Sequence, residues 1–286
     1  MKFEFLFLDA VDPSLGRVDR ESLSQQALME MVIEGIANKE EICGDPEDPK
    51  DTEEWEGVTV EDGDVAEIDW YQFDIEGSLH LEWLPSSVKE FLVRWNRLAG
   101  TIQWTSLPIS MKKLNLSLNA FTGPIDLERL PARMEYFNVT HNLLSGSLKI
   151  PSLPDTMTHF YADENKFSGS VDLTRLPAAL ALLDLTDNLL SGPVVLTQLP
   201  INLAELYLSM NQFSGSLDLT KLPSSMSRLH VDDNAFSGAV DLSQLPQRLE
   251  GLDLSSNDLS GEVFISDELF DRVNAENTKL IKRPIE

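Results

Sequence analysis

The sequence has a single cysteine, few basic residues and no long apolar run. Cys43 cannot form an internal disulfide on its own, which favours a reducing compartment, so we expect a cytoplasmic protein. The apolar residues between Met1 and Leu8 are interrupted by Glu4 and end at Asp9, which makes them too short for a secretory signal. No stretch reaches the roughly 18 apolar residues of a membrane span, which predicts no membrane insertion.

Basic residues are scarce relative to acidic ones. The 286 residues include 48 Asp and Glu but only 22 Lys and Arg, for a net charge of −26. Because nucleic acids and anionic lipids attract Lys and Arg, this balance excludes a nucleic-acid binder and favours a basic protein partner. Hydrophobic residues make up 42% of the chain, too many for a disordered acidic protein, so the charge must surround a folded core.

Internal repetition is the main feature of the sequence. A 23-residue unit recurs nine times over residues 65–265, with the pattern Leu-x-x-Leu-x-Leu-x-x-Asn-x-Phe-Ser-Gly followed by Leu-Asp-Leu and Leu-Pro. Its asparagine can donate to and accept from backbone groups of neighbouring units, and an unpaired buried backbone group costs about 1–3 kcal/mol. We therefore predict a structural asparagine ladder, formed by Asn96, Asn119, Asn142, Asn165, Asn188, Asn211, Asn234 and Asn257.

Each segment of the unit has an expected conformation. Alternating apolar residues predict a short strand that is buried on one face, and parallel stacking of these strands makes one long sheet. The Ser-Gly pair predicts a tight turn. The Val-Asp-Leu segments at residues 171–173 and 240–242 predict a second short strand. The following Leu-Pro excludes a helix interior, so the convex side should have 3-10 or extended turns.

These units identify the chain as similar to the leucine-rich repeat superfamily. The Asn-x-Phe/Leu-Ser-Gly motif resembles the plant-type subclass of receptor ectodomains, although Asp-Leu replaces the proline of that motif. The 23-residue length also resembles leucine-rich repeat proteins of kinetoplastids and other protists. The resemblance implies a leucine-rich repeat solenoid, mostly β, with a curved parallel β-sheet on the concave side.

The two ends are expected to cap the solenoid, because a terminal repeat exposes apolar surface and strand edges. Residues 1–64 form the predicted N-terminal cap, with an amphipathic helix over about 20–37 and a solvated acidic loop over 39–54. Residues 266–286 form the predicted C-terminal cap and tail. They should contain a short capping helix over 266–274 and a basic tail, 278–286, that only a partner would order.

The N-terminal cap contains the sequence Trp55-x-Gly57-Val58. It resembles the plant-type cap motif Cys-x-Trp-x-Gly-Val-x-Cys, with Glu53 and Val60 in the two cysteine positions. The resemblance implies that the shape of this cap is kept without its disulfide, which supports the expected reducing compartment.

The concave face is the expected binding surface. Side chains six, four, two and one residue before each ladder asparagine should point to it. Tyr, Trp and His gather at these positions, and these residue types are enriched at recognition surfaces. The alternative is that they occur here by chance, as on any exposed face of a soluble protein. Acidic residues of adjacent strands form a patch that a basic partner would neutralise. The predicted partner-binding residues are Trp95, Tyr136, His141, His159, Tyr161, Asp163, Glu164, Asp184, Asp187, Tyr207, His230, Asp232 and Asp233.

Catalysis, metals and cofactors are not expected. His141, Asp163, Glu164 and Asp187 lie on adjacent predicted strands and could hold a divalent ion or exchange a proton. However, the sequence has no HExxH, GxSxG or phosphate-loop motif, and Cys43 lies in an acidic segment that disfavours a thiolate. An open sheet also offers no water-excluding pocket, so we predict a non-enzymatic protein without a metal or cofactor.

The sequence therefore predicts a protein-interaction module, either a free adaptor or a subunit of a larger complex, that binds a basic protein on its concave face. The alternative is a secreted or surface receptor fragment that binds a ligand or carbohydrate. Two glycosylation sequons, which begin at Asn115 and Asn138, would suit that alternative. The identity of the partner and the oligomeric state stay open.

Overall fold

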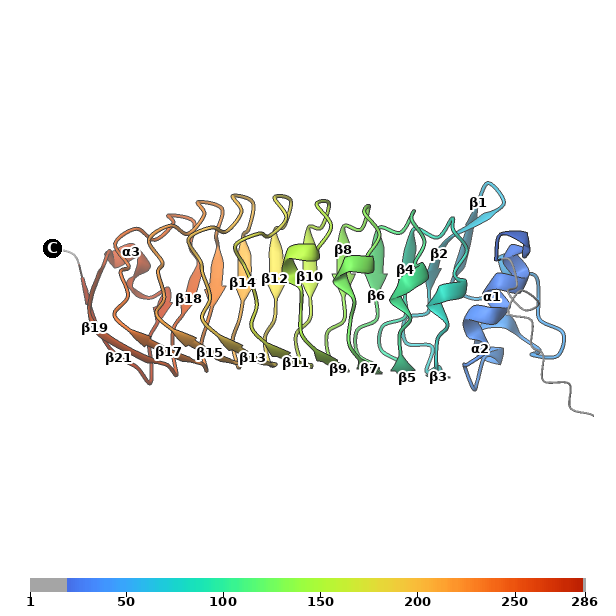
Figure 1. Ribbon diagram of the computed structural model, residues 1–286, viewed down its shortest axis with the longest axis horizontal. Coiled ribbons are helices and arrows are strands. Elements are labelled where there is room, and N and C mark those ends of the chain that lie inside the picture. Colours follow the sequence, from blue (N-terminus) through green and yellow to red (C-terminus); the bar gives the residue numbers. More distant parts are fainter. Residues whose placement is uncertain (1–19, 285–286) are drawn as a thin grey trace, which may run out of the picture.

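The computed structural model describes residues 20–284, so the apolar residues 1–8 considered above as a signal lie outside the described part. The chain winds through successive turns that stack side by side into an elongated solenoid (Figure 1). Successive turns add their strands to two sheets, of eleven and ten strands. The predicted leucine-rich repeat solenoid with one long parallel sheet is confirmed.

The first sheet has eleven strands, and its outward side chains form the face that was expected above to be concave. From β2 to β18 the strands pair in parallel, so that each residue lies beside the residue 23 positions later. β1 pairs with β2 in the antiparallel direction at the N-terminal end. The strands are β1 (Val58–Glu61), β2 (Asp64–Asp69), β4 (Glu90–Leu92), β6 (Lys113–Asn115), β8 (Tyr136–Asn138), β10 (His159–Tyr161), β12 (Leu182–Asp184), β14 (Glu205–Tyr207), β16 (Arg228–His230), β18 (Gly251–Asp253) and β20 (Val273–Asn274).

The second sheet has ten strands and runs along another flank of the solenoid (Figure 1). Most of its strands begin directly after a ladder asparagine and end at the glycine of the Ser-Gly pair. The strands are β3 (Glu76–Gly77), β5 (Arg97–Thr101), β7 (Ala120–Gly123), β9 (Leu143–Gly146), β11 (Lys166–Gly169), β13 (Leu189–Gly192), β15 (Gln212–Gly215), β17 (Ala235–Gly238), β19 (Asp258–Ile265) and β21 (Lys279–Pro284).

The prediction of a second strand at residues 171–173 and 240–242 is therefore wrong. Gly169 has φ +85°, a left-handed conformation that glycine adopts readily and that ends the strand early. Beyond it, Val171 and Leu173 are buried, while Asp172 Oδ1 accepts a hydrogen bond from the Thr174 N–H. These contacts turn the chain at a corner instead of extending the sheet.

The convex side has short 3-10 helices in four consecutive repeats and turns in the later ones. The Leu-Pro pair follows each of these helices and prevents a longer one, as the sequence predicts. The helices are η3 (Leu81–Trp83), η4 (Trp104–Ser106), η5 (Leu127–Arg129) and η6 (Ile150–Ser152).

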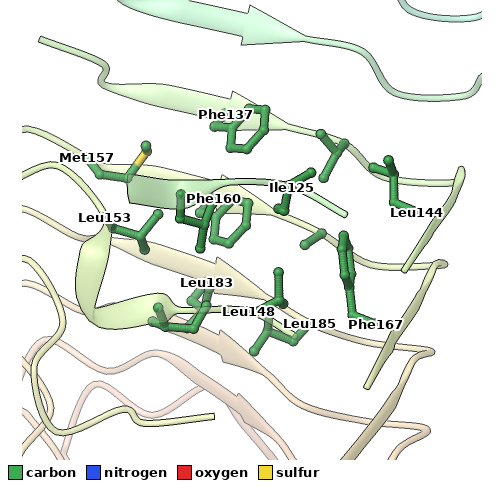
Figure 2. Close-up of a cluster of buried hydrophobic side chains, with 14 of the residues drawn as sticks. Ile125, Phe137, Leu144, Leu148, Leu153, Met157, Phe160, Phe167, Leu183 and Leu185 are labelled. Carbon is green, nitrogen blue, oxygen red and sulfur yellow. The ribbon is translucent and has the colours of Figure 1, made fainter. Parts of the chain in front are cut away.

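The core is a column of leucine and phenylalanine side chains enclosed by the two sheets and the convex turns (Figure 2). Phe137 and Phe160 occupy the same position in consecutive repeats and stack with ring centroids 5.4 Å apart. Phe167 and Leu183 are also fully buried. Burial of each such side chain contributes about 1.5–3 kcal/mol, so the stacking of repeats provides most of the stability.

The N-terminal helix is shorter than predicted. α1 spans Gln25–Ile33, and Arg20–Ser22 before it forms a separate 3-10 turn, η1. Ser24 fixes the start of α1 because its Oγ accepts a hydrogen bond from the Ala27 N–H. The buried face of α1 covers the first repeat next to η3, through Leu28, Met29, Val32 and Ile33.

The acidic segment 39–54 is only partly a loop, which corrects the expected solvated conformation. It contains α2 (Glu40–Cys43) and η2 (Thr52–Glu54), and both Ile42 and Cys43 are buried. Trp55 directly follows it and is only 2% exposed. The indole N–H of Trp55 donates to the Lys50 carbonyl over 2.8 Å, which fixes the segment to the cap.

The C-terminal end also differs from the prediction. α3 has only four residues, Asp267–Phe270, and the tail forms β21, which pairs in parallel with β19. Arg283 forms an ion pair with Glu262 over 2.9 Å, while Lys282 Nζ donates to the Phe270 and Val273 carbonyls. The basic residues up to Pro284 are therefore ordered by the solenoid itself and need no partner.

Candidate functional site

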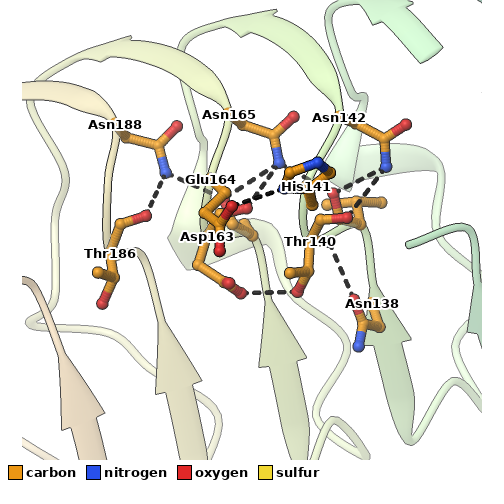
Figure 3. Close-up of polar contacts among 11 residues, drawn as sticks. Asn138, Thr140, His141, Asn142, Asp163, Glu164, Asn165, Thr186 and Asn188 are labelled. Atoms are coloured by element: carbon orange, nitrogen blue, oxygen red, sulfur yellow. Dashed lines mark hydrogen bonds and ion pairs between the residues drawn. The ribbon is translucent and has the colours of Figure 1, made fainter. Parts of the chain in front are cut away.

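The asparagine ladder fixes the edge of the concave face. In each repeat the amide spans two turns of the chain, and Asn165 is representative. Its Nδ2 donates to the Val139 carbonyl over 2.9 Å and to the Asp163 carbonyl over 3.0 Å. Its Oδ1 accepts from the Leu144 N–H over 3.0 Å. The neighbouring amides of Asn142 and Asn188 repeat the arrangement (Figure 3).

The residue before each ladder asparagine has a left-handed backbone, which non-glycine residues rarely adopt. Backbone hydrogen bonds between turns hold this conformation, since the Glu164 N–H donates to the Thr186 carbonyl over 2.9 Å. The side chains at this position are therefore presented at a fixed angle beside the sheet. Among the predicted site residues, the φ values are 60° for Trp95, 53° for His141, 51° for Glu164, 50° for Asp187 and 49° for Asp233.

One row of the concave face alternates tyrosine and aspartate. Tyr161, Asp184 and Tyr207 lie side by side on β10, β12 and β14, and His230 and Asp253 continue the row on β16 and β18. The strands of a sheet are about 4.8 Å apart, so each tyrosine is an immediate neighbour of Asp184.

Two aromatic groups flank Asp184. On one side, Tyr161 lies 5.7 Å from Tyr136 and 6.3 Å from His159, measured between ring centroids. On the other side, the rings of Tyr207 and His230 are perpendicular and 5.1 Å apart. The structure thus brings five of the predicted aromatic residues into two groups, one on each side of the strand that carries Asp184.

Tyr207 is also held by charged neighbours. Its hydroxyl donates to Glu205 Oε2 over 2.5 Å, and Glu205 pairs with Arg228 over 2.9 Å. Burial, followed by the hydrogen bond and negative charge of Glu205, raises the pKa of Tyr207 to about 12. Glu205 and Arg228 each lie six residues before a ladder asparagine, so the spacing places both on this face, although neither is among the predicted partner-binding residues.

The carboxylates at the centre of the face are partly removed from water. Burial raises the pKa of Asp163 to about 6, opposed by a 2.6 Å hydrogen bond from Thr140 Oγ1. Burial also raises the pKa of Asp184, whose Oδ1 accepts from the Thr186 N–H over 3.0 Å. Both carboxylates therefore lie in an environment that stabilises negative charge less well than water does.

His141, Glu164 and Asp187 line a shallow pocket of about 260 Å³ beside the ladder. His141 Nδ1 lies 2.6 Å from Glu164 Oε2, while the Asp163 carboxylate points instead to Thr140 (Figure 3). Within residues 20–284 there is no group of three or more His, Cys, Asp or Glu arranged to hold a metal ion.

The remaining predicted residues do not join this centre. Trp95 lies towards the N-terminal end of the face and contacts Tyr71, with ring centroids 6.5 Å apart and Arg94 above the Tyr71 ring. Asp232 accepts a 2.5 Å hydrogen bond from Ser209 Oγ, and Asp233 is exposed on the C-terminal side. The thirteen predicted residues therefore form a central cluster with one outlier towards the N-terminal end and two on the C-terminal side.

The convex flank has a larger pocket that the sequence did not indicate. It measures about 590 Å³ and lies between η4, η5 and the ends of the second-sheet strands. Trp104, Ile125 and Leu127 contribute apolar surface to it, and a Glu128–Lys149 ion pair lies at its rim. It lies at the corners after Gly100, Gly123 and Gly146, where each unit was expected to form a second strand.

The two sequons lie within the first sheet. Asn115 is buried, and its Oδ1 accepts from both the N–H and the Oγ of Ser117. Asn138 is half-buried, and its Oδ1 accepts from the Thr140 N–H. Both side chains are thus engaged in local hydrogen bonds. No helix in the described part of the chain is long and apolar enough to cross a membrane.

No protein-family model matches the sequence, and no curated protein is significantly similar to it. Solved structures do match. The Arabidopsis receptor kinase HAESA, solved with the peptide hormone IDA and the co-receptor SERK1, is 26% identical over 73% of this chain and 36% of its own, with a TM-score of 0.60. YopM from Yersinia enterocolitica is 27% identical over 71% of this chain and 40% of its own, with a TM-score of 0.54.

A third similar structure is the ectodomain of the Arabidopsis thaliana receptor kinase GASSHO1/SCHENGEN3, at 20% identity over 90% of this chain and 36% of its own, with a TM-score of 0.64. The chain spans less than half the length of these three structures. Because they come from a plant and a bacterium, the likeness supports the repeat solenoid without distinguishing a subclass.

Proposed function

We propose that this leucine-rich repeat solenoid is a non-enzymatic protein-interaction module, an adaptor or a subunit of a larger complex, that binds a basic polypeptide on its concave face. HAESA and YopM share more than a quarter of their aligned residues with it, and HAESA was solved with a bound peptide hormone. These similarities support the general role. The basic character of the partner rests on the charges of the face itself.

The observation that carries the proposal is a set of carboxylates without counter-ions. Within residues 20–284, Asp163, Asp184 and Asp187 form no ion pair with a lysine or arginine, whereas Glu90 pairs with Lys113 and Glu205 with Arg228. Like charges that are partly buried and close together repel one another. A basic segment bound across the face would supply the missing positive charge, and its side chains could also pack against Tyr161 and Tyr207.

We also propose that the protein acts inside the cell. This rests on the single cysteine and on Glu53 and Val60, which occupy the disulfide positions of the similar plant-type cap. A secreted receptor fragment is the competing function, and it would call for glycans at Asn115 or Asn138. Mass spectrometry of the native protein distinguishes the two, because an occupied sequon would overturn the intracellular assignment.

The binding face can be tested by affinity purification from the source cell at low and moderate salt. The bait is either the wild type, the Tyr161→Ala/Tyr207→Ala double variant, or Asp218→Asn on the convex side as a control. We expect a basic protein that is retained by the wild type and the control, is lost from the double variant and is released by salt. Equal capture by all three baits would place the interaction elsewhere on the solenoid.

A further inference from the structure

We propose that Asp184, together with the flanking Tyr161 and Tyr207, forms a binding site for one arginine side chain of the partner. This site rests on the proposed function of the concave face and specifies the group that the face recognises.

The arrangement around Asp184 differs from that of its neighbours in the sheet. β12 presents Leu182 and Asp184 to the face, between two strands that each present a tyrosine. The Tyr161 ring lies with Tyr136 and His159, and the Tyr207 ring lies with His230 while its hydroxyl is held by Glu205. Both tyrosine side chains are therefore held by contacts with other residues of the face.

The Asp184 carboxylate has no lysine or arginine partner in the described part of the chain. Burial disfavours its charge more strongly than the Thr186 hydrogen bonds and the weaker attraction of His230 favour it. Asp163 lies close enough to add its own negative charge. A cation bound here would relieve both unfavourable effects.

Two properties of the site favour arginine over lysine. Tyr161 and Tyr207 are separated by two strand spacings, about 9.6 Å at the backbone, which leaves room for a flat group with an aromatic ring on either side. A guanidinium is planar, stacks on aromatic faces and donates hydrogen bonds in its plane to a carboxylate, whereas an ammonium is compact and more strongly hydrated.

Asp253 provides a matched comparison within the same row. It also lies four residues before a ladder asparagine, but its carboxylate is fully engaged. Its Oδ1 accepts from the N–H and the Oγ of Ser255, and its Oδ2 accepts from Asn274 Nδ2. Its lateral neighbours are His230 and Asn274, so it has no tyrosine on either side.

The site can be tested on the full-length protein by NMR. The four tyrosine rings are labelled and assigned with Tyr→Phe variants, and Nα-acetyl-arginine methylamide is titrated in. The matched probes are the citrulline compound, which has nearly the same shape without the charge, and the lysine compound. We expect saturable shifts of Tyr161 and Tyr207 with arginine, at about millimolar affinity. Asp184→Asn should weaken binding at least tenfold, whereas Asp253→Asn should leave it unchanged.

Three results would overturn the arginine site: equal shifts with citrulline, equal affinity for lysine, or unchanged binding by Asp184→Asn. Unfolding curves of the two Asn variants ensure that a loss of binding is not a loss of fold. The proposed function is tested separately by the capture experiment. A partner held through the concave face with no arginine response would refute this site alone, whereas equal capture by every bait would refute the function of the face.

Discussion

Thr140 Oγ1 donates a hydrogen bond to Asp163 Oδ1 over 2.6 Å, across two consecutive repeats of the solenoid. The bond favours the charged form of Asp163, while burial and the nearby charges of Asp184 and Glu164 disfavour it. The balance leaves the pKa of Asp163 at about 6, above the ordinary value of 3.8. The centre of the concave face therefore changes its charge within an accessible pH range.

The first prediction concerns stability and pH. Because the pKa of Asp163 is higher in the folded than in the unfolded state, the folded protein binds the extra proton between about pH 4 and pH 6. Ionisation of Asp163 thus reduces stability as pH rises through 6. As the pH rises from 4 to 7.5, the free energy of unfolding of Asp163→Asn should increase relative to that of the wild type. The increase should be about 1 kcal/mol or less, after allowance for solvent screening.

Urea denaturation at the two pH values measures this difference. Asp172→Asn is a control of opposite sign, because hydrogen bonds from Thr174 lower the pKa of Asp172. Its stabilising effect is present at neutral pH and is lost as pH falls, so the variant should lose stability at neutral pH only. If both variants changed in stability with pH in the same way, the opposite pKa shifts assigned to Asp163 and Asp172 would be wrong.

The second prediction concerns the ladder. Asn165→Ala removes the partners of the Val139 and Asp163 carbonyls and of the Leu144 N–H. It should lower the free energy of unfolding by about 2–3 kcal/mol, since buried backbone groups are left unpaired. The adjacent Lys166→Ala, at an exposed position of β11, should change it by about 0.5 kcal/mol or less. Chemical denaturation with equal losses would show that the ladder is not structural.

The third prediction concerns the aromatic residues. Once a partner is known, Tyr161→Ala or Tyr207→Ala should each weaken its binding by about 2 kcal/mol, chiefly through faster dissociation. Tyr161→Phe should retain most of the affinity, because ring contacts to Tyr136 and His159 persist without the hydroxyl. Surface plasmon resonance gives both rates. Unchanged dissociation in the alanine variants would show that these rings are not anchors.

The fourth prediction separates the rim from the centre of the face. Asp187 is exposed, so Asp187→Asn should slow association and reduce its dependence on salt, with little effect on dissociation. Asp184 is half-buried at the centre of the face, so Asp184→Asn should instead speed dissociation. Association rates measured from low to moderate salt distinguish the two. A dominant effect of Asp187→Asn on dissociation would place this carboxylate inside the interface.

The repeat itself and the composition of the concave face could be predicted from the sequence, because both follow from a strict 23-residue spacing. That spacing alone places Tyr161, Asp184 and Tyr207 in one row. It does not determine rotamers, so the pairings of Thr140 with Asp163 and of Glu205 with Arg228 appear only in the structure.

The errors in the fold prediction also have physical causes. The second-sheet strands contain the Ser-Gly pair, which has little strand preference alone and extends only because neighbouring repeats pair with it. The basic tail, which includes Lys282 and Arg283, was expected to be ordered only by a partner. In the structure, an acidic side chain and backbone carbonyls of the same end of the solenoid bind those charges.

The in-register stacking of repeats also limits the conformation of any ligand that follows the row. Tyr161 and Tyr207 are two strands apart, about 9.6 Å. An extended β-strand presents side chains of one face about every 6.8 Å, which does not match this interval. A left-handed polyproline II helix has three residues per turn and advances about 9.3 Å, so every third side chain would meet every second repeat.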